Sequence, residues 1–330
     1  MTATPQTNTT LQEISRALAK CDSVAICGHV NPDGDCIGST LGLACALWAA
    51  GKEAHPLVAD DEPLDSSFSF MPGFHKMVPA SSFEGSVDAF VVVDAPNGER
   101  IGHAAEELKN RAPLTVTIDH HAAPERHSML SYTDPDSAST TLLVWEVAKH
   151  LGVDSDASGM RDVATCCYSG LVTDTGRFMH QNTNVEAFMA AAQMAACGID
   201  VAHISECLFQ SRTEASVKLD AIAVDRMRPV GAHALLSWLT LADMDALGAS
   251  KHDAENAIAP IRSIAGFQVA CLLKEREDCV RGSLRAKDDT DVAAIAREFG
   301  GGGHKAAAGF TLECGIDEAV SVMEERLSGL

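Results

Sequence analysis

Three short apolar segments, each ending directly at a polar residue, constrain the fold of this chain most strongly. The segments are 24–28, 89–93 and 114–118, and the first of them carries no alternating polar positions, which is typical of a strand that is buried on both sides. Helical patterns follow the first two segments, so the order predicts an α/β fold whose first part is a parallel, doubly wound sheet. At the carboxyl edge of that sheet, where open α/β sheets form their sites, three polar residues should meet: His29, Asp94 and Asp119.

The order of the predicted elements also divides the chain, whose 330 residues suffice for two domains. Helical patterns dominate from residue 137 to about residue 218, and strand patterns return beyond residue 226. We therefore expect a first domain over residues 1–210, a linker over residues 211–226, and a smaller α/β domain over residues 227–330.

The composition excludes several classes of function. A net charge of −21 repels long nucleic acids and anionic membranes, and an aromatic content of 5% disfavours a long single-strand track of stacking side chains. The first ten residues lack the basic and apolar parts of a signal peptide, and the apolar stretch 37–50 is too short to span a bilayer. The 11 cysteines form no C-x-x-C pair, which favours buried thiols in a reducing compartment. We expect a cytoplasmic protein that binds neither membranes nor long duplexes.

The segment 28–39, with the sequence GHVNPDGDCIGS, places one imidazole and two carboxylates close together after the first strand. Pro32 and Gly34 bend the backbone, so Asp33 and Asp35 can point into a common site. Divalent metals such as Mn²⁺ accept this mixture of imidazole and carboxylate ligands. The alternative interpretation is an Asp-Gly turn that caps a helix and happens to contain a histidine.

Three further clusters carry the same kinds of side chain. Asp94 alone is most simply a helix cap, whereas Asp119 is followed by two imidazoles, His120 and His121, that point in different directions. One of these imidazoles can bind a metal while the other contacts a substrate. Asp174 ends an apolar helical stretch, where a carboxylate needs a partner. Four such clusters in one domain predict a single polar site.

The motifs resemble those of the DHH phosphoesterase superfamily. They read GHVNPDGDCIGS at 28–39, VVVDAPN at 91–97, IDHHAAPERHS at 118–128 and LVTDTGRF at 171–178, in the order of that family. The segment 282–310 is similar to the DHH-associated domain, which is marked by a glycine run followed by His and Ala-Ala-Gly. The size of the chain is similar to that of the NrnA-type subgroup of oligoribonucleases and 3′-phosphoadenosine-5′-phosphate (pAp) phosphatases.

The resemblance implies a centre of two Mn²⁺ ions, with Mg²⁺ or Co²⁺ as substitutes, in the catalytic domain over residues 1–210. His29 and Asp33 would hold one ion, and Asp94 would bridge the two. The second ion would be held by three residues: Asp35, His120 and Asp174.

The resemblance also assigns roles beside the metals. The implied catalytic residues are Asp94, His121, which would face the scissile phosphate, and Asp119, which would orient the imidazoles. The DHH-associated domain over residues 227–330 would grip the substrate across a cleft between the domains, and the implied contacts are Ser283, Arg285, Gly301, Gly302, Gly303 and His304. A helix C-cap followed by a turn is the alternative for the glycine run. Relatives often carry Ser where this chain has Ala286, which removes one hydroxyl contact.

The implied activity is Mn²⁺-dependent hydrolysis of phosphoester bonds in short oligoribonucleotides and of pAp to AMP and phosphate. The closest alternative is a phosphodiesterase acting on cyclic di-AMP or pApA, and a manganese inorganic pyrophosphatase is disfavoured because it lacks a GGGH segment. A third alternative is an RNA-binding module without catalysis, as in alanyl-tRNA synthetases. The complete set of implied ligands argues against that module. The sequence leaves a homodimer open.

Overall fold

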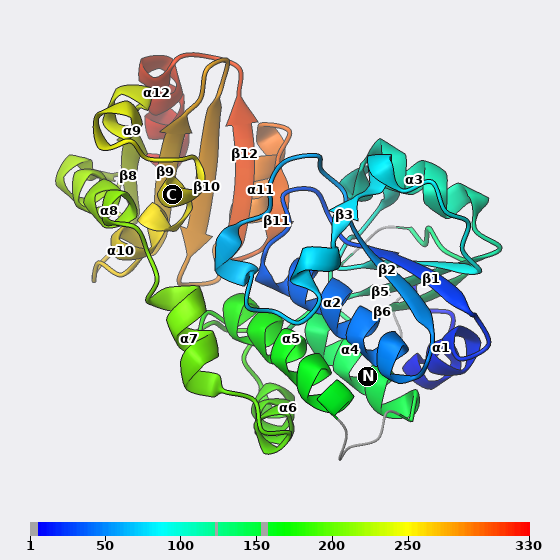
Figure 1. Ribbon diagram of the computed structural model, residues 1–330. Helices are drawn as coiled ribbons and strands as arrows, with labels where there is room; N and C mark the ends of the chain where they lie inside the picture. Colours follow the sequence, from blue (N-terminus) through cyan, green and yellow to red (C-terminus); the bar gives the residue numbers. More distant parts are fainter. Residues whose placement is uncertain (1–5, 123–124, 153–157) are drawn as a thin grey trace. The chain divides into compact units, whose positions relative to one another are not determined.

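A computed structural model describes residues 6–122, 125–152 and 158–330 (Figure 1). Parts of the predicted N-terminal tail and of the motif at 118–128 therefore lie outside the described residues. The chain divides into two compact units, Met1–Ser211 and Arg212–Leu330.

The first unit is built on six parallel strands in the order β3-β2-β1-β4-β5-β6. The three apolar segments of the sequence form the neighbours β1, β4 and β5, and every residue of β4 is buried. This arrangement confirms the predicted parallel sheet. The strands are β1 (Ser23–Cys27), β2 (Glu53–Val58), β3 (Val78–Pro79), β4 (Ala89–Val93), β5 (Leu114–Asp119) and β6 (Leu130–Thr133).

Helices cover both faces of this sheet. Helices α2, α4 and α5 pack against one another in Figure 1, and their apolar side chains share a core with Val91 and Val93 of β4. Ala105 and Leu108 of α3 pack with Phe90 and Val92, which point to the opposite face. The helices are α1 (Leu11–Leu18), α2 (Gly34–Ala49), α3 (Gly102–Arg111), α4 (Thr140–His150), α5 (Ser158–Asp174), α6 (Val185–Ala196) and α7 (Val201–Phe209).

Helix α2 begins at Gly34, three residues earlier than the apolar pattern indicates. Asp33 is its N-cap, because its Oδ1 accepts hydrogen bonds of 3.0 Å from the backbone N–H groups of Asp35 and Cys36. The capping interpretation therefore holds for Asp33. Asp35 lies in the first helical turn, where the helix dipole stabilises a negative charge.

The second unit contains a separate mixed sheet in the order β11-β12-β10-β9-β8-β7. Strands β8 and β9 are parallel, and the other neighbours are antiparallel. The strands are β7 (Arg228–Val230), β8 (Ala234–Leu239), β9 (Val269–Glu275), β10 (Val280–Ala286), β11 (Gly302–His304) and β12 (Ala307–Leu312). The helices are α8 (Glu214–Arg226), α9 (Leu241–Leu247), α10 (Ile258–Arg262), α11 (Val292–Glu298) and α12 (Ile316–Leu327).

Most of the segment that we expected as a linker, residues 211–226, forms helix α8. Thr213 caps this helix, and its Leu219 and Ala223 are fully buried in a core shared with β8 and β9. In the sequence, these buried apolar residues of α8 are hard to recognise because charged residues surround them. The structure therefore places residues 212–226 within the second unit.

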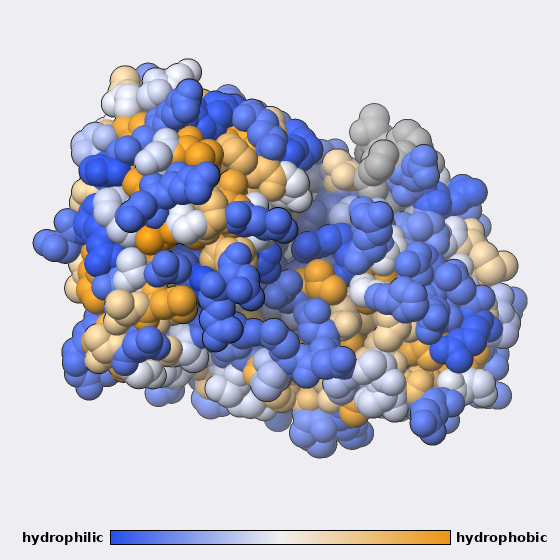
Figure 2. Space-filling view, turned by 90° about the horizontal axis from the view of Figure 1, so that it is seen from above, coloured by the Kyte–Doolittle hydropathy of each residue, from blue (hydrophilic) through white to orange (hydrophobic). Residues whose placement is uncertain are grey.

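A membrane span needs a helix that is both long and apolar. No single described helix is long and apolar enough to cross a bilayer, and α6 and α7 satisfy both criteria only as a pair bent by 116°. On the face drawn in Figure 2, apolar side chains are scattered among hydrophilic ones.

Candidate active site

The candidate site lies at the carboxyl ends of β1, β4 and β5, three neighbouring strands of the parallel sheet. His29 follows β1, Asp94 follows β4, and Asp119 ends β5. Asp94 has a φ of +55°, a left-handed conformation that is uncommon for residues other than glycine. Its N–H donates to the carbonyl of Ile118 (3.1 Å), which helps to hold this turn.

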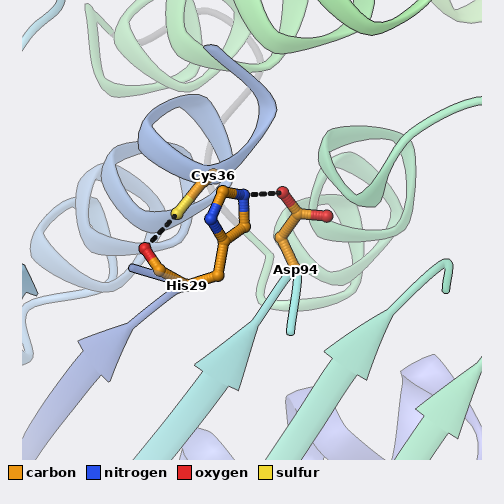
Figure 3. A group of neighbouring side chains, drawn as sticks. All are labelled: His29, Cys36 and Asp94. Atoms are coloured by element: carbon orange, nitrogen blue, oxygen red, sulfur yellow. Dashed lines mark hydrogen bonds and ion pairs between the residues drawn. The ribbon is translucent and has the colours of Figure 1, made fainter. Parts of the chain in front are cut away.

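His29 faces two carboxylates through one ring nitrogen. Its Nε2 lies 3.5 Å from Asp94 Oδ2, as drawn in Figure 3, and 3.8 Å from Asp33 Oδ1. Its Nδ1 lies 2.8 Å from the carbonyl oxygen of Val30. A carbonyl partner favours the tautomer with the proton on Nδ1, so the neutral ring presents the Nε2 lone pair to the carboxylates.

His120 forms an equivalent group with the other carboxylates. Its Nε2 lies 3.5 Å from Asp94 Oδ1, 3.8 Å from Asp35 Oδ2 and 3.9 Å from Asp174 Oδ2. Its Nδ1 lies 3.2 Å from the carbonyl oxygen of Ser137, which again directs Nε2 toward the acids. The two oxygens of Asp94 therefore face two different imidazoles.

His121 is oriented by Asp119 rather than by the backbone. Its Nδ1 is 2.8 Å from Asp119 Oδ1 and 3.6 Å from Asp94 Oδ1. The rings of His120 and His121 are nearly perpendicular, at 75°, so the two adjacent imidazoles point in different directions. The His121 side chain is 22% exposed, compared with 5% for His120, and is therefore the more accessible of the two.

Burial makes this collection of charges unfavourable by itself. Burial and the charges of Asp94 and Asp174 raise the pKa of Asp35 well above its usual range, and burial raises that of Asp174 to about 7. Burial alone would lower the pKa of His120, but the surrounding carboxylates outweigh it and raise that pKa to about 10. Mutual repulsion of buried acids favours the binding of cations.

The donor atoms suit divalent metal ions. Ligand atoms of Asp35, His120 and Asp174 lie within 4.8 Å of one another, and so do those of Asp94, His120 and His121. Imidazole nitrogens and carboxylate oxygens are the ligands that Mn²⁺ and similar ions accept, and the hydrogen-bonded Nδ1 atoms fix the ring orientations. The residues of this edge therefore could hold divalent metal ions.

Sequence reasoning missed three residues that support these acids. The backbone N–H groups of Thr140 and Thr141 donate to Asp35 (2.7 and 3.0 Å), and the Thr140 hydroxyl donates to Asp94 Oδ1 (2.9 Å). The run Ser139-Thr140-Thr141 at the start of a predicted helix was the available signal, since helix N-termini bind carboxylates. Asn182 Nδ2 donates to Asp174 Oδ2 (3.2 Å) and left no recognisable pattern in the sequence.

The candidate substrate-binding residues gather on one part of the second sheet. Ser283 and Arg285 are half-buried and alternate along β10 with the buried Gly282, Leu284 and Ala286. Ala286 therefore points into the core, and a serine there would not offer its hydroxyl on the side of Arg285. The effect of Ala286 on substrate preference stays a prediction.

The strand register aligns the glycine run with the same part of β10. Strand β12 lies between β10 and β11. Its Gly309 pairs with Ser283 of β10 on one side and with Gly302 of β11 on the other. In the same way, its Ala307 pairs with Arg285 of β10 and with His304 of β11. Phe299 is the C-cap of α11, and Gly300 follows it with a φ of +70°. The interpretation as a helix end therefore holds for Gly300, whereas residues 302–304 form a strand instead of a loop. At Gly301, a Cβ would lie 2.2 Å from the Gly309 carbonyl oxygen, so this close approach requires glycine.

Comparisons with known proteins agree with this architecture. The DHH family N-terminal domain matches residues 23–171, and the DHHA1 domain matches residues 237–329. The bifunctional oligoribonuclease and PAP phosphatase NrnA of Thermus thermophilus is 31% identical, over 89% of this chain and 85% of the relative. The cyclic-di-AMP phosphodiesterase PdeA of Listeria monocytogenes is 25% identical over 96% of this chain, but over only 48% of its own length.

A solved structure extends the similarity to the whole fold. The exopolyphosphatase-related protein of Bacteroides fragilis superposes with a TM-score of 0.89 at 26% identity, covering 97% of this chain and 95% of that chain. The order of the motifs, the parallel sheet and the relative at 31% identity all lead to one assignment. The chain belongs to the DHH family and carries a DHHA1 domain after its DHH domain.

Proposed function

We propose that this protein is a Mn²⁺-dependent phosphoesterase that hydrolyses short oligoribonucleotides and converts pAp to AMP and phosphate. The observation that carries the proposal is the position of Asp94, whose two oxygens face His29 and His120. The similarity to a bifunctional oligoribonuclease and PAP phosphatase, at 31% identity over most of both chains, supports the choice of substrates.

The metal-binding roles follow the two groups around Asp94. His29 and Asp33 hold one ion together with Asp94, and Asp94 is shared with a second group formed by Asp35, His120 and Asp174. Two divalent cations in such a centre supply an activated water nucleophile and stabilise negative charge at phosphorus. The backbone N–H groups of Thr140 and Thr141 keep the Asp35 carboxylate oriented.

His121 is the residue that acts on the substrate directly. Burial alone would lower its pKa, but the hydrogen bond to Asp119 and the nearby carboxylates raise that pKa. The protonated form of this imidazole is therefore favoured relative to that of a free histidine. In that form it neutralises a phosphate oxygen or donates a proton to the leaving group, while Asp119 fixes the ring orientation.

Arg285 and its neighbours bind the part of the substrate that carries a second phosphate. A chain with a net charge of −21 repels anionic substrates, so local cations must provide the attraction. Arg285 supplies a guanidinium. Strand β12, between β10 and β11, carries the small residues Ala307 and Gly309 beside Arg285 and Ser283, so no large side chain stands at these two positions. The contacts that we propose are Ser283, Arg285, Gly301, Gly302, Gly303 and His304.

Hydrolysis of cyclic di-AMP or pApA is the second candidate function, and it is favoured by the similarity to PdeA over 96% of this chain. A panel of pAp, pApA, RNA of two to five nucleotides, cyclic di-AMP and pyrophosphate, assayed with Mn²⁺, separates the candidates by kcat/KM. We expect the highest values for pAp and short RNA. A value for cyclic di-AMP at least tenfold higher would favour the second function. No hydrolysis with Mn²⁺, Mg²⁺ or Co²⁺ would contradict both.

A further inference from the structure

Cys36 is a buried thiol at the start of helix α2, beside the His29 side of the candidate metal centre. Its side chain is 2% exposed, and its Sγ lies 3.8 Å from the carbonyl oxygen of His29 (Figure 3). A Cβ at Gly28 would lie 2.2 Å from this sulfur, so the glycine makes room for it. Cys36 has no role in the function proposed above.

The sulfur belongs to a compact group of donor atoms. Ligand atoms of His29, Cys36 and Asp94 lie within 4.8 Å of one another, and His29 Nε2 is 3.5 Å from Asp94 Oδ2. The group on the other side of Asp94 consists of Asp35, His120 and Asp174 and offers nitrogen and oxygen atoms alone. The two sides of the centre therefore differ in chemical softness, because sulfur prefers cations such as Zn²⁺ and Cd²⁺ whereas carboxylates suit Mn²⁺ and Mg²⁺.

We propose that Cys36 provides a sulfur ligand on the His29 side, so that this position binds thiophilic divalent cations more tightly than the His120 side does, although both positions accept Mn²⁺. The inference rests on the metal centre of the proposed function and adds a difference between its two positions. The binding step is a ligand exchange without oxidation or reduction. The S–H bond breaks, its proton leaves to the solvent, and a sulfur–metal bond forms.

Another buried thiol of the same domain provides a matched control. Cys27 ends strand β1 and is fully buried, but its Sγ lies 3.5 Å from the carbonyl oxygen of Gly28, within the core on the α3 face of the sheet. A serine at position 27 removes a buried sulfur without changing the donor group of His29, Cys36 and Asp94. A serine at position 36 removes the sulfur from that group and retains a hydrogen-bond donor.

The test is a titration of the full-length, metal-free protein with Cd²⁺, followed by near-ultraviolet sulfur-to-cadmium absorption and by cadmium NMR. The wild type should bind one equivalent with a sulfur signature that Cys27→Ser retains. Cys36→Ser should lose that signature, and its Cd²⁺ affinity should fall about tenfold or more. Mn²⁺ binding to the His120 side should remain, which shows that the variant is folded.

Two outcomes separate the failure of this inference from the failure of the proposed function. A wild-type Cd²⁺ signal without sulfur character, or an equal signal in Cys36→Ser, would mean that Cys36 only fills space beneath His29. Absence of both Mn²⁺ and Cd²⁺ binding in the wild type would instead contradict the metal centre itself. The sulfur character of the Cd²⁺ signal is measured on the wild-type protein, so its absence would contradict the inference even if Cys36→Ser does not fold.

Discussion

The two units of this protein present their candidate functional residues in opposite ways. In the first unit, acids and imidazoles from several elements converge at one sheet edge, where Asp35, Asp94 and Asp119 are at most 2% exposed. In the second unit, Ser283 and Arg285 are half-buried side chains on one strand of a mixed sheet. Buried charges depend on one another and on cations, whereas accessible side chains can change individually. Substitutions of the buried acids of the first unit should therefore affect metal binding and catalysis together, and those of the accessible side chains in the second unit should affect the choice of substrate.

The largest effect should come from Asp94, because both groups of ligands share it. Asp94→Asn should reduce activity by about a thousandfold or more and lower the metal content of both positions. Elemental analysis of the purified protein, together with kcat for pAp, measures the two effects. Asp162→Asn, on helix α5 but outside the donor groups, should change neither. Full metal content with retained turnover in Asp94→Asn would exclude a shared ligand.

His121 should show the next largest effect, but on catalysis alone. His121→Ala should lower kcat by about 10²–10⁴-fold, the usual contribution of general acid–base catalysis, while both metal ions stay bound. Metal content and single-turnover rates of the same preparation distinguish these effects. Loss of one ion would mean that His121 is a ligand and that the roles of His120 and His121 are exchanged.

The second unit should respond differently to substitution. Arg285→Ala should lower kcat/KM for pAp and dinucleotides by roughly tenfold to a hundredfold, since a charge-assisted hydrogen bond contributes about 1.5–3 kcal/mol. A chromogenic phosphodiester without a second phosphate should be hydrolysed almost normally. Arg281→Ala removes the same charge from an exposed position on the same strand that is not one of the proposed contacts, and should have little effect. Equal losses on both kinds of substrate would contradict a substrate-binding role for Arg285.

The smallest effect should come from Asn182, which contacts a proposed ligand without being one. Its Nδ2 donates to Asp174 Oδ2 and to the carbonyl oxygen of Ala138 (2.9 Å), so Asn182→Ala removes a contact that orients the carboxylate. The affinity for one ion should fall about tenfold, as measured by competition with a chelating dye. Unchanged affinity for both ions would show that Asp174 needs no such support.

The contrast between the units also explains which features the sequence could predict. Parallel strands place their carboxyl ends at one edge whatever loops follow, so His29, Asp94 and Asp119 could be grouped from three apolar segments. The strands on either side of the three central ones, β2, β3 and β6, were not predicted, because they are short or carry residues such as His55 and Pro56 that interrupt an apolar pattern. Helix α8 was expected as a linker because its few core-facing residues, Leu219, Ile222 and Ala223, lie among many charged and polar ones.

Within the site, the sequence identified the acids and imidazoles but not what holds them. Thr140 and Asn182 reach Asp35 and Asp174 from elements 105 and 8 residues away in the chain, so their contacts depend on tertiary packing. The division of the ligands between two ions came from the resemblance to the family, and it stays a prediction. In the second unit, the strand register could not be read from a run of glycines, which fits a cap, a loop or a strand equally well.

The central claim is that the first unit holds two metal ions joined by Asp94. Titration of the metal-free protein with Mn²⁺, followed by electron paramagnetic resonance, tests it most directly. We expect two ions per chain, and the signal of the fully loaded protein should show magnetic coupling between neighbouring ions. Binding of a single ion, or of two ions with uncoupled signals, would contradict a shared centre at Asp94.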